Sequence, residues 1–206
     1  MHAGRKPFSM IREFHVADWF TLGNAVCGTG ALFSSMTYLQ TADINRIYSA
    51  WALILAALVF DILDGRIARW RQKSSLMGRE LDSLADIISF GVAPAALGYA
   101  CGLQGLYDRI ILVYFVACGV SRLARYNVTA DQLSAGTGKV TYFEGTPIPT
   151  SFAIACVLAL AAMFGAVNEQ LWLGAIELGG YTLHPLSLIF AVSGSLMISR
   201  IRIPKL

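Results

Sequence analysis

The sequence predicts an all-α integral membrane protein with six transmembrane helices and a short N-terminal interfacial helix. Hydrophobic residues make up 56% of its 206 residues, charged residues only 14%, and the mean hydropathy is +0.58. Soluble domains carry fewer apolar and more charged residues. Apolar segments of near membrane-spanning length recur along the chain, and basic residues gather in alternate connections. No repeat, linker or second domain interrupts this pattern, so we expect residues 1–206 to form a single domain.

Residues 1–17 are expected to form the interfacial segment. Their apolar residues are too scattered for the core of a signal peptide. A helix that lies on a membrane surface mixes such residues with basic ones, and a frayed tail is the alternative. The residues concerned are Phe8, Met10, Ile11 and Phe14 with Arg5, Lys6 and Arg12.

Residues 19–198 are expected to form the six-helix membrane bundle. Each apolar segment has the length that a bilayer requires or falls a little short of it. The fourth and sixth are short, which favours helices that end at a water-filled cavity. The predicted spans are Trp19–Leu39, Ile47–Ala68, Leu84–Leu103, Ile110–Ala124, Pro149–Val167 and His184–Ile198.

The distribution of basic residues predicts the orientation of these spans. All of the 16 Lys and Arg residues except Arg46 and Arg109 lie near the termini or the second and fourth connections. By the positive-inside rule, both termini and these connections face the cytoplasm in a cytoplasmic (inner) membrane. Anionic membrane lipids are therefore expected partners, whereas the scattered basic residues make nucleic acid a poor alternative.

Four aspartates in or beside the second and third apolar segments are the strongest indication of chemistry. At about 100° per residue, Asp61 and Asp64 share one helical face, and Asp82 and Asp86, four apart, share another. Because charges beside apolar segments are costly, we expect the two faces to oppose each other around cations. Oxygen ligands without nearby His or Cys favour a two-metal site for Mg²⁺ or Mn²⁺. The alternative is a buried ion-pair network with Arg66, Arg69 and Arg79.

The spacing of these residues resembles the signature of the CDP-alcohol phosphotransferases, integral membrane enzymes that join an alcohol to a phosphatidyl group and release CMP. The pattern D-x2-D-G-x2-A-R-x8-G-x3-D-x3-D runs from Asp61 to Asp86 with all eight defining positions in place. Further segments resemble the phosphatidylserine synthase branch of the family over most of the chain. These are Thr21–Asn24, Leu81–Pro94, Ser121–Asn127 and Phe143–Pro149.

The resemblance implies roles for individual residues. Asp61, Asp64, Asp82 and Asp86 would ligate two divalent cations, and Asp86 would also be the catalytic base for the acceptor hydroxyl. Gly65, Ala68 and Gly78 are small and would leave room for ribose and base. The guanidinium of Arg69 would bind a phosphate. The positions implied to contact the cytidine diphosphate are Asp64, Gly65, Ala68, Arg69, Gly78 and Asn24.

The implied substrates are CDP-diacylglycerol and L-serine, and family members suggest a homodimer. Arg122 and Arg125, three apart on one helix, could clamp the serine carboxylate, or else anchor the helix at lipid headgroups. The serine ammonium could meet Glu144, Asn127 or Thr146.

Two other functions remain open at this point. Inositol phosphate or glycerol phosphate could replace serine as the acceptor, although a phosphorylated acceptor would favour a denser basic pocket. A divalent cation transporter could also use acids within the membrane. Transport would not explain the fixed positions of Gly65, Ala68 and Arg69 between those acids.

Overall fold

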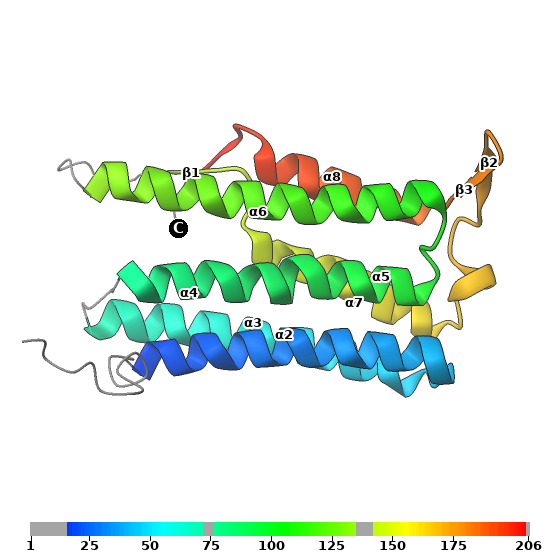
Figure 1. The fold of residues 1–206 in the computed structure, drawn as a ribbon, viewed down its shortest axis with the longest axis horizontal. Coiled ribbons are helices and arrows are strands. Elements are labelled where there is room, and N and C mark those ends of the chain that lie inside the picture. Colours follow the sequence, from blue (N-terminus) through cyan, green and yellow to red (C-terminus); the bar gives the residue numbers. More distant parts are fainter. Residues whose placement is uncertain (1–15, 72–75, 135–141, 205–206) are drawn as a thin grey trace, which may run out of the picture.

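The protein is a bundle of long helices in the computed structural model, which describes residues 16–71, 76–134 and 142–204. The helices lie side by side with their long axes nearly parallel (Figure 1). The helical elements are α2 (Val16–Thr41), α3 (Asn45–Arg71), α4 (Leu76–Asp86), the π-helix η1 (Ile87–Val92), α5 (Ala93–Cys101), α6 (Leu106–Ser134), the 3₁₀ turn η2 (Ile148–Ser151), α7 (Phe152–Met163), the 3₁₀ turns η3 (Asn168–Gln170) and η4 (Pro185–Ser187), and α8 (Leu188–Ile198).

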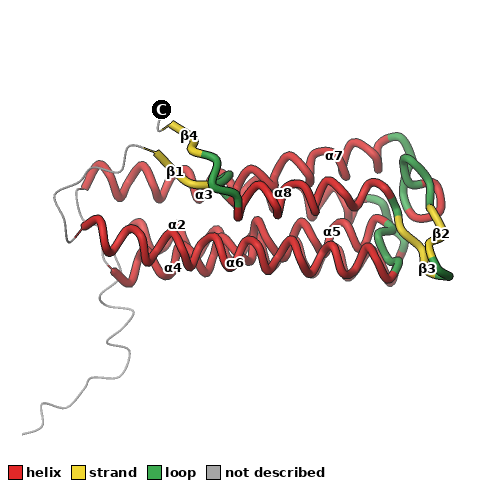
Figure 2. Tube along the Cα trace, turned by 90° about the horizontal axis from the view of Figure 1, so that it is seen from above, coloured by secondary structure: helices red, strands yellow, loops and turns green. Residues whose placement is uncertain are grey.

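Two small antiparallel sheets lie at opposite ends of the bundle (Figure 2). Strands β1 (Tyr142–Glu144) and β4 (Arg202–Pro204) pair with Tyr142 opposite Pro204. Strands β2 (Ile176–Leu178) and β3 (Tyr181–Leu183) form a hairpin with Ile176 opposite Leu183. The end that carries β1 and β4 also holds the start of α2, the end of α3, the start of α4 and the end of α6 (Figure 1).

The predicted helical class is confirmed, and two helical stretches have membrane-spanning length and hydropathy within the described ranges. They are Asn45–Ile67 and Met77–Cys101, and shorter apolar helices cover Ile148–Met163 and Pro185–Ile198. Helices α2 and α6 contain 26 and 29 residues. At about 1.5 Å per residue, each of these two helices is long enough to cross a bilayer.

Several boundaries differ from the prediction. The fourth span was expected to end at Ala124, but α6 continues to Ser134. Residues 120–134 include neither Gly nor Pro, so the helix continues after its apolar segment ends. The third helical rod begins at Leu76, eight residues before the expected start, and therefore contains Asp82 as well as Asp86. The predicted interfacial helix lies almost entirely outside the described residues.

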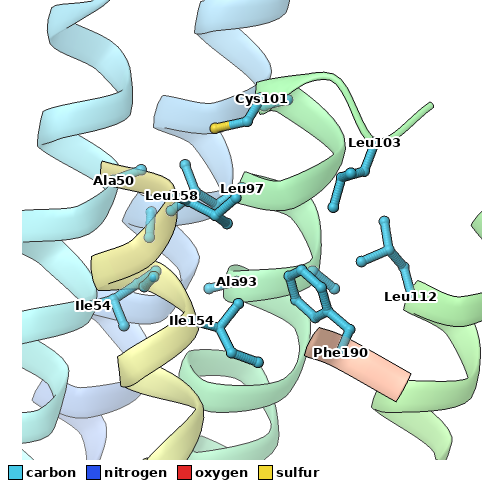
Figure 3. Close-up of a cluster of buried hydrophobic side chains, with 14 of the residues drawn as sticks. Ala50, Ile54, Ala93, Leu97, Cys101, Leu103, Leu112, Ile154, Leu158 and Phe190 are labelled. Carbon is cyan, nitrogen blue, oxygen red and sulfur yellow. The ribbon is translucent and has the colours of Figure 1, made fainter. Parts of the chain in front are cut away.

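The hydrophobic core is formed where α3, α5, α7 and α8 meet. Ile54, Leu97 and Leu158 are fully buried there (Figure 3). Phe190 of α8 packs edge-on against Phe115 of α6, with 5.2 Å between the ring centroids and an angle of 82°. These contacts join helices that are distant in the sequence and fix the relative positions of α3, α5 and α6.

A buried carboxylate closes the end of the bundle that carries the β2–β3 hairpin. Asp108, at the start of α6, is fully buried and accepts a hydrogen bond from the Gly105 backbone N–H at 3.0 Å. It also accepts one from the His184 backbone N–H at 2.9 Å, and its Oδ2 lies 2.6 Å from His184 Nδ1. These partners satisfy Asp108 within the protein, so this acid has a structural explanation.

Candidate active site

Three of the four predicted metal ligands converge at the opposite end of the bundle. Asp61 and Asp64 come from the last turns of α3, and Asp82 comes from α4. One carboxylate oxygen of each residue lies within 4.8 Å of the others. Helices α3 and α4 both pack against α2, and only four residues separate them in the sequence. Asp61 and Asp64 are three residues apart on α3, and Asp82 and Asp86 are four apart on α4. Each pair therefore shares one face of its helix, and the two faces meet at the site.

Asp86, the fourth acid of the pattern, lies one turn beyond Asp82 at the end of α4. It is 7% exposed, and its Oδ1 accepts a hydrogen bond from Asn24 Nδ2 at 3.2 Å. The π-helix η1 begins at the next residue, and such wide turns are frequent at functional sites.

The donor set fits a divalent cation. Oδ1 of Asp82 is buried and has no hydrogen-bond partner in the described parts of the chain. A buried carboxylate oxygen is normally satisfied, as the oxygens of Asp108 are at the other end of the bundle. Clustered carboxylate oxygens are the ligands that Mg²⁺ and Mn²⁺ prefer, and a cation there would offset the repulsion among the acids.

A cavity of about 200 Å³ adjoins the carboxylates between α4 and α6. Nε of Arg122 is buried without a hydrogen-bond partner in the described chain, and its guanidinium lies 5.9 Å from the centroid of the Tyr126 ring. Cationic and anionic side chains therefore meet in one small space. The lining residues are Arg79, Asp82, Ser83, Asp86, Arg122, Leu123, Tyr126, Pro147 and Pro149.

Of the five predicted acceptor residues, only Arg122 lines this cavity. Arg125 is exposed and lies outside the lining. The amide of Asn127 donates to Glu80 Oε2 at 3.2 Å and to Ser83 Oγ at 3.1 Å, and it thereby joins α6 to α4.

The positions of the other two predicted acceptor residues, Thr146 and Glu144, follow from backbone contacts. Thr146 donates its backbone N–H to the Leu196 carbonyl at 3.2 Å, but is not among the lining residues. Glu144 lies on β1 opposite Arg202 of β4. The structure thus separates Arg122 from the residues with which the sequence analysis grouped it.

The residues predicted to contact a cytidine diphosphate lie on the helices that carry the acids. A side chain built at Gly65 would meet no other atom within 4 Å, so the space beside Asp64 is open. Gly78 lies near the start of α4, and Ala68 and Arg69 lie on α3, where the description does not extend to their side chains. Asn24 contacts Asp86, as described above.

Two residues of the site were not predicted to act there. Arg79 lines the cavity because it precedes Asp82 by three residues and Asp86 by seven, so all three share a helical face. Thr21 donates its hydroxyl to Asp64 Oδ2 at 3.0 Å. Two features of the sequence could have indicated these residues. Arg79 lies within the acidic pattern, and Thr21 lies three residues before Asn24 in an apolar segment.

Comparisons with known proteins point to one family. A sequence model described as CDP-alcohol phosphatidyltransferase matches residues 14–192. The chain is 44% identical over 202 residues to the CDP-diacylglycerol–serine O-phosphatidyltransferase of Saccharomyces cerevisiae, with 96% of this chain and 73% of that protein covered. It is 32% identical to the Bacillus subtilis protein of the same name, covering 92% of this chain and 90% of that one. For the Mycobacterium leprae protein of that name the identity is 37%, over 66% of this chain and 46% of that protein.

We predict that Mn²⁺ stabilises the purified protein through the carboxylate cluster. A ligand at 100 times its Kd contributes about 2.7 kcal/mol to folding, which thermal unfolding in detergent would register as a rise in Tm. Asp82→Asn should lose most of this rise, and without metal it should unfold no earlier than the wild type because one repelling charge is gone. Asp43→Asn, at an exposed turn beside Arg46, is the matched control and should keep the rise. An undiminished Mn²⁺ effect in Asp82→Asn would contradict the assignment of this ligand.

Proposed function

The chain belongs to the CDP-alcohol phosphatidyltransferase family, and we propose that it transfers the phosphatidyl group of CDP-diacylglycerol to the hydroxyl of L-serine. The relatives reported above bear the name of this transferase activity. The observation that carries the proposal is the cavity that joins the carboxylate cluster to Arg79 and Arg122. In this cavity the reacting phosphate and a small zwitterionic acceptor can bind at adjacent sites.

The chemistry follows from the residues around this cavity. The serine hydroxyl oxygen forms a bond to the phosphorus, the bond from phosphorus to the CMP oxygen breaks, and the hydroxyl proton passes to Asp86. Two divalent cations, Mg²⁺ or Mn²⁺, supply charge neutralisation and alignment of the diphosphate when they are held by Asp61, Asp64, Asp82 and Asp86. Asp86 is the base because it lines the cavity and is held on one oxygen by Asn24, which leaves the other oxygen for the proton.

The nucleotide end of the substrate is assigned to the open side of α3. Gly65 leaves space beside Asp64, where a ribose or base can approach the helix backbone. Ala68, Arg69 and Gly78 are assigned to the same substrate on the family pattern, with Arg69 binding a phosphate. The diacylglycerol chains then extend toward the lipid.

The serine end is assigned to the side of the cavity formed by α6. Arg122 binds the serine carboxylate, because its buried Nε needs an acceptor and its planar guanidinium matches a carboxylate. Arg79 adds a second positive charge, and the Ser83 hydroxyl accepts from the ammonium. Arg125, Asn127, Glu144 and Thr146 have no part in this assignment.

The membrane arrangement completes the proposal. The six helical rods of the described residues, counting α4–η1–α5 as one, cross the cytoplasmic membrane. The end with the carboxylates faces the cytoplasm, in accordance with the basic residues around it. Residues 1–206 act as one domain, and two copies form a homodimer as suggested for the family. CDP-diacylglycerol enters from the lipid and serine from the cytoplasm.

An acceptor panel tests the reaction. Purified protein with CDP-diacylglycerol and Mg²⁺ or Mn²⁺ should release CMP when L-serine is present, and removal of metal with EDTA should stop the release. Glycerol phosphate and inositol phosphate are the comparison acceptors, since two arginines could also bind a phosphate. Preference for either one would overturn serine as the acceptor. Metal uptake into vesicles without CMP release would indicate a transporter.

Arg122 and Arg125 provide a matched pair for the acceptor site. A charge-assisted contact of about 1.5–3 kcal/mol predicts that Arg122→Ala raises the KM for serine roughly ten- to a hundredfold, with little change in the KM for CDP-diacylglycerol. Arg122→Lys should rescue only partly, because an ammonium lacks the planar fork. Arg125→Ala, on the exposed face of the same helix, should retain wild-type kinetics. If Arg125→Ala raised the KM for serine more than Arg122→Ala does, Arg125 and not Arg122 would be the residue that binds the serine carboxylate.

Gly65→Leu tests whether the open space beside Asp64 receives the nucleotide. Leucine favours a helix over glycine by roughly 0.5–1 kcal/mol, and the added side chain meets no neighbour at its Cβ. The variant should therefore unfold no earlier than the wild type and yet bind CDP-diacylglycerol at least about tenfold more weakly, as steric exclusion requires. Ala52→Leu, on an exposed part of α3, is the control. Normal binding by Gly65→Leu would place the nucleotide elsewhere.

A further inference from the structure

Helix α2 contributes hydrogen bonds to the two most buried carboxylates of the site. Thr21 Oγ donates to Asp64 Oδ2 at 3.0 Å, and Asn24 Nδ2 donates to Asp86 Oδ1 at 3.2 Å. Thr21 is 3% exposed and Asn24 is fully buried. Because they are three residues apart, the two side chains lie on one face of α2 and reach one acid from α3 and one from α4.

The position of α2 against the site is fixed by separate contacts. Ser89 of η1 donates its hydroxyl to the Asn24 carbonyl at 2.9 Å. Gly28 lies one turn further along the same face of α2, and a Cβ there would come within 2.7 Å of Ser89 Cα. A larger residue would push the helices apart, so Gly28 permits the close approach. The hydrogen bonds to Asp64 and Asp86 are therefore made from a firmly packed helix.

The two side chains also have features that a purely structural role leaves unexplained. Oδ1 of Asn24 is buried without a hydrogen-bond partner in the part of the chain that the structure describes. A buried amide that served packing alone would normally satisfy both of its ends. The Thr21 hydroxyl can also donate to the Ala17 carbonyl at 3.2 Å, so α2 does not require Asp64 to satisfy it. Both donors act on the carboxylates.

We propose that Thr21 and Asn24 are positioning residues, each fixing one carboxylate of the metal and base constellation. This inference rests on the proposed metal-dependent transfer. A hydrogen bond to one carboxylate oxygen restricts rotation of the group and leaves its second oxygen directed at a cation or a proton. Thr21 acts through Asp64 and so sets cation affinity. Asn24 acts through Asp86 and so sets the rate of proton removal.

Direct titration with Mn²⁺ tests Thr21 without use of activity. Loss of such a supporting contact costs about ten- to a hundredfold in metal affinity. Thr21→Val, which keeps the shape and removes the hydroxyl, should bind Mn²⁺ at least about tenfold more weakly, and Thr21→Ser should restore most of the affinity. Thr37→Val is the matched control, since the Thr37 hydroxyl on the same helix donates to the Phe33 carbonyl at 2.8 Å, away from the site. Thermal unfolding of each variant reports whether α2 still packs.

The kinetic division between the two residues completes the test. Asn24→Leu should lower kcat, measured at saturating Mn²⁺, at least about tenfold beyond any loss of Mn²⁺ affinity, because Asp86 is the base as well as a ligand. If Asn24→Leu does not fold, Asn24→Ala replaces it, and the same changes in kcat and Mn²⁺ affinity are expected. Wild-type Mn²⁺ affinity in Thr21→Val, together with its loss in Asp64→Asn, would overturn the positioning role and leave the metal site standing. Absence of Mn²⁺ binding in the wild type would instead remove the proposed function on which the inference rests.

Discussion

Repulsion among carboxylates is the constraint on which the site end of this protein depends. Oxygens of Asp61, Asp64 and Asp82 lie within 4.8 Å of one another. At an effective dielectric constant of about 20, each such pair of unit charges repels by roughly 3.5 kcal/mol or more. A fold can hold these acids together if cations neutralise them and if the surrounding helices resist separation. The helix contacts around the cluster meet the second condition.

Two groups of buried polar side chains lie at opposite ends of the bundle. At one end, Asp108 is satisfied by backbone donors and by His184, and it closes the turn between α5 and α6. At the other, an oxygen of Asp82 and Nε of Arg122 are buried without partners in the described chain. The apolar core between them fixes the relative positions of α3, α5 and α6. The unsatisfied groups of opposite charge therefore face a small cavity, where a charged substrate can meet them.

Helical periodicity explains how much of this site could be predicted. Spacings of three and four within one helix place Asp61 with Asp64 and Asp82 with Asp86, so a local rule was enough to group them. The same rule could not separate Arg122 from Arg125, because residues three apart differ by only about 60° around a helix. Packing of α6 against α4 decides which arginine reaches the cavity, and the sequence does not contain that rotation. The contacts from Thr21 and Asn24 likewise require knowledge that α2 lies against η1. The length of α6 was missed because hydropathy marks where a segment can be in lipid, whereas the helix continues through polar residues to Ser134.

The most direct test of this account is the location of Mn²⁺ by anomalous diffraction from crystals of the protein grown with CDP-diacylglycerol. The account predicts two Mn²⁺ peaks between α3 and α4, with oxygens of Asp61, Asp64, Asp82 and Asp86 at coordination distance of about 2.0–2.3 Å, close to the values for hard divalent cations. Binding of Mn²⁺ only at other residues, in crystals of protein that releases CMP, would contradict it.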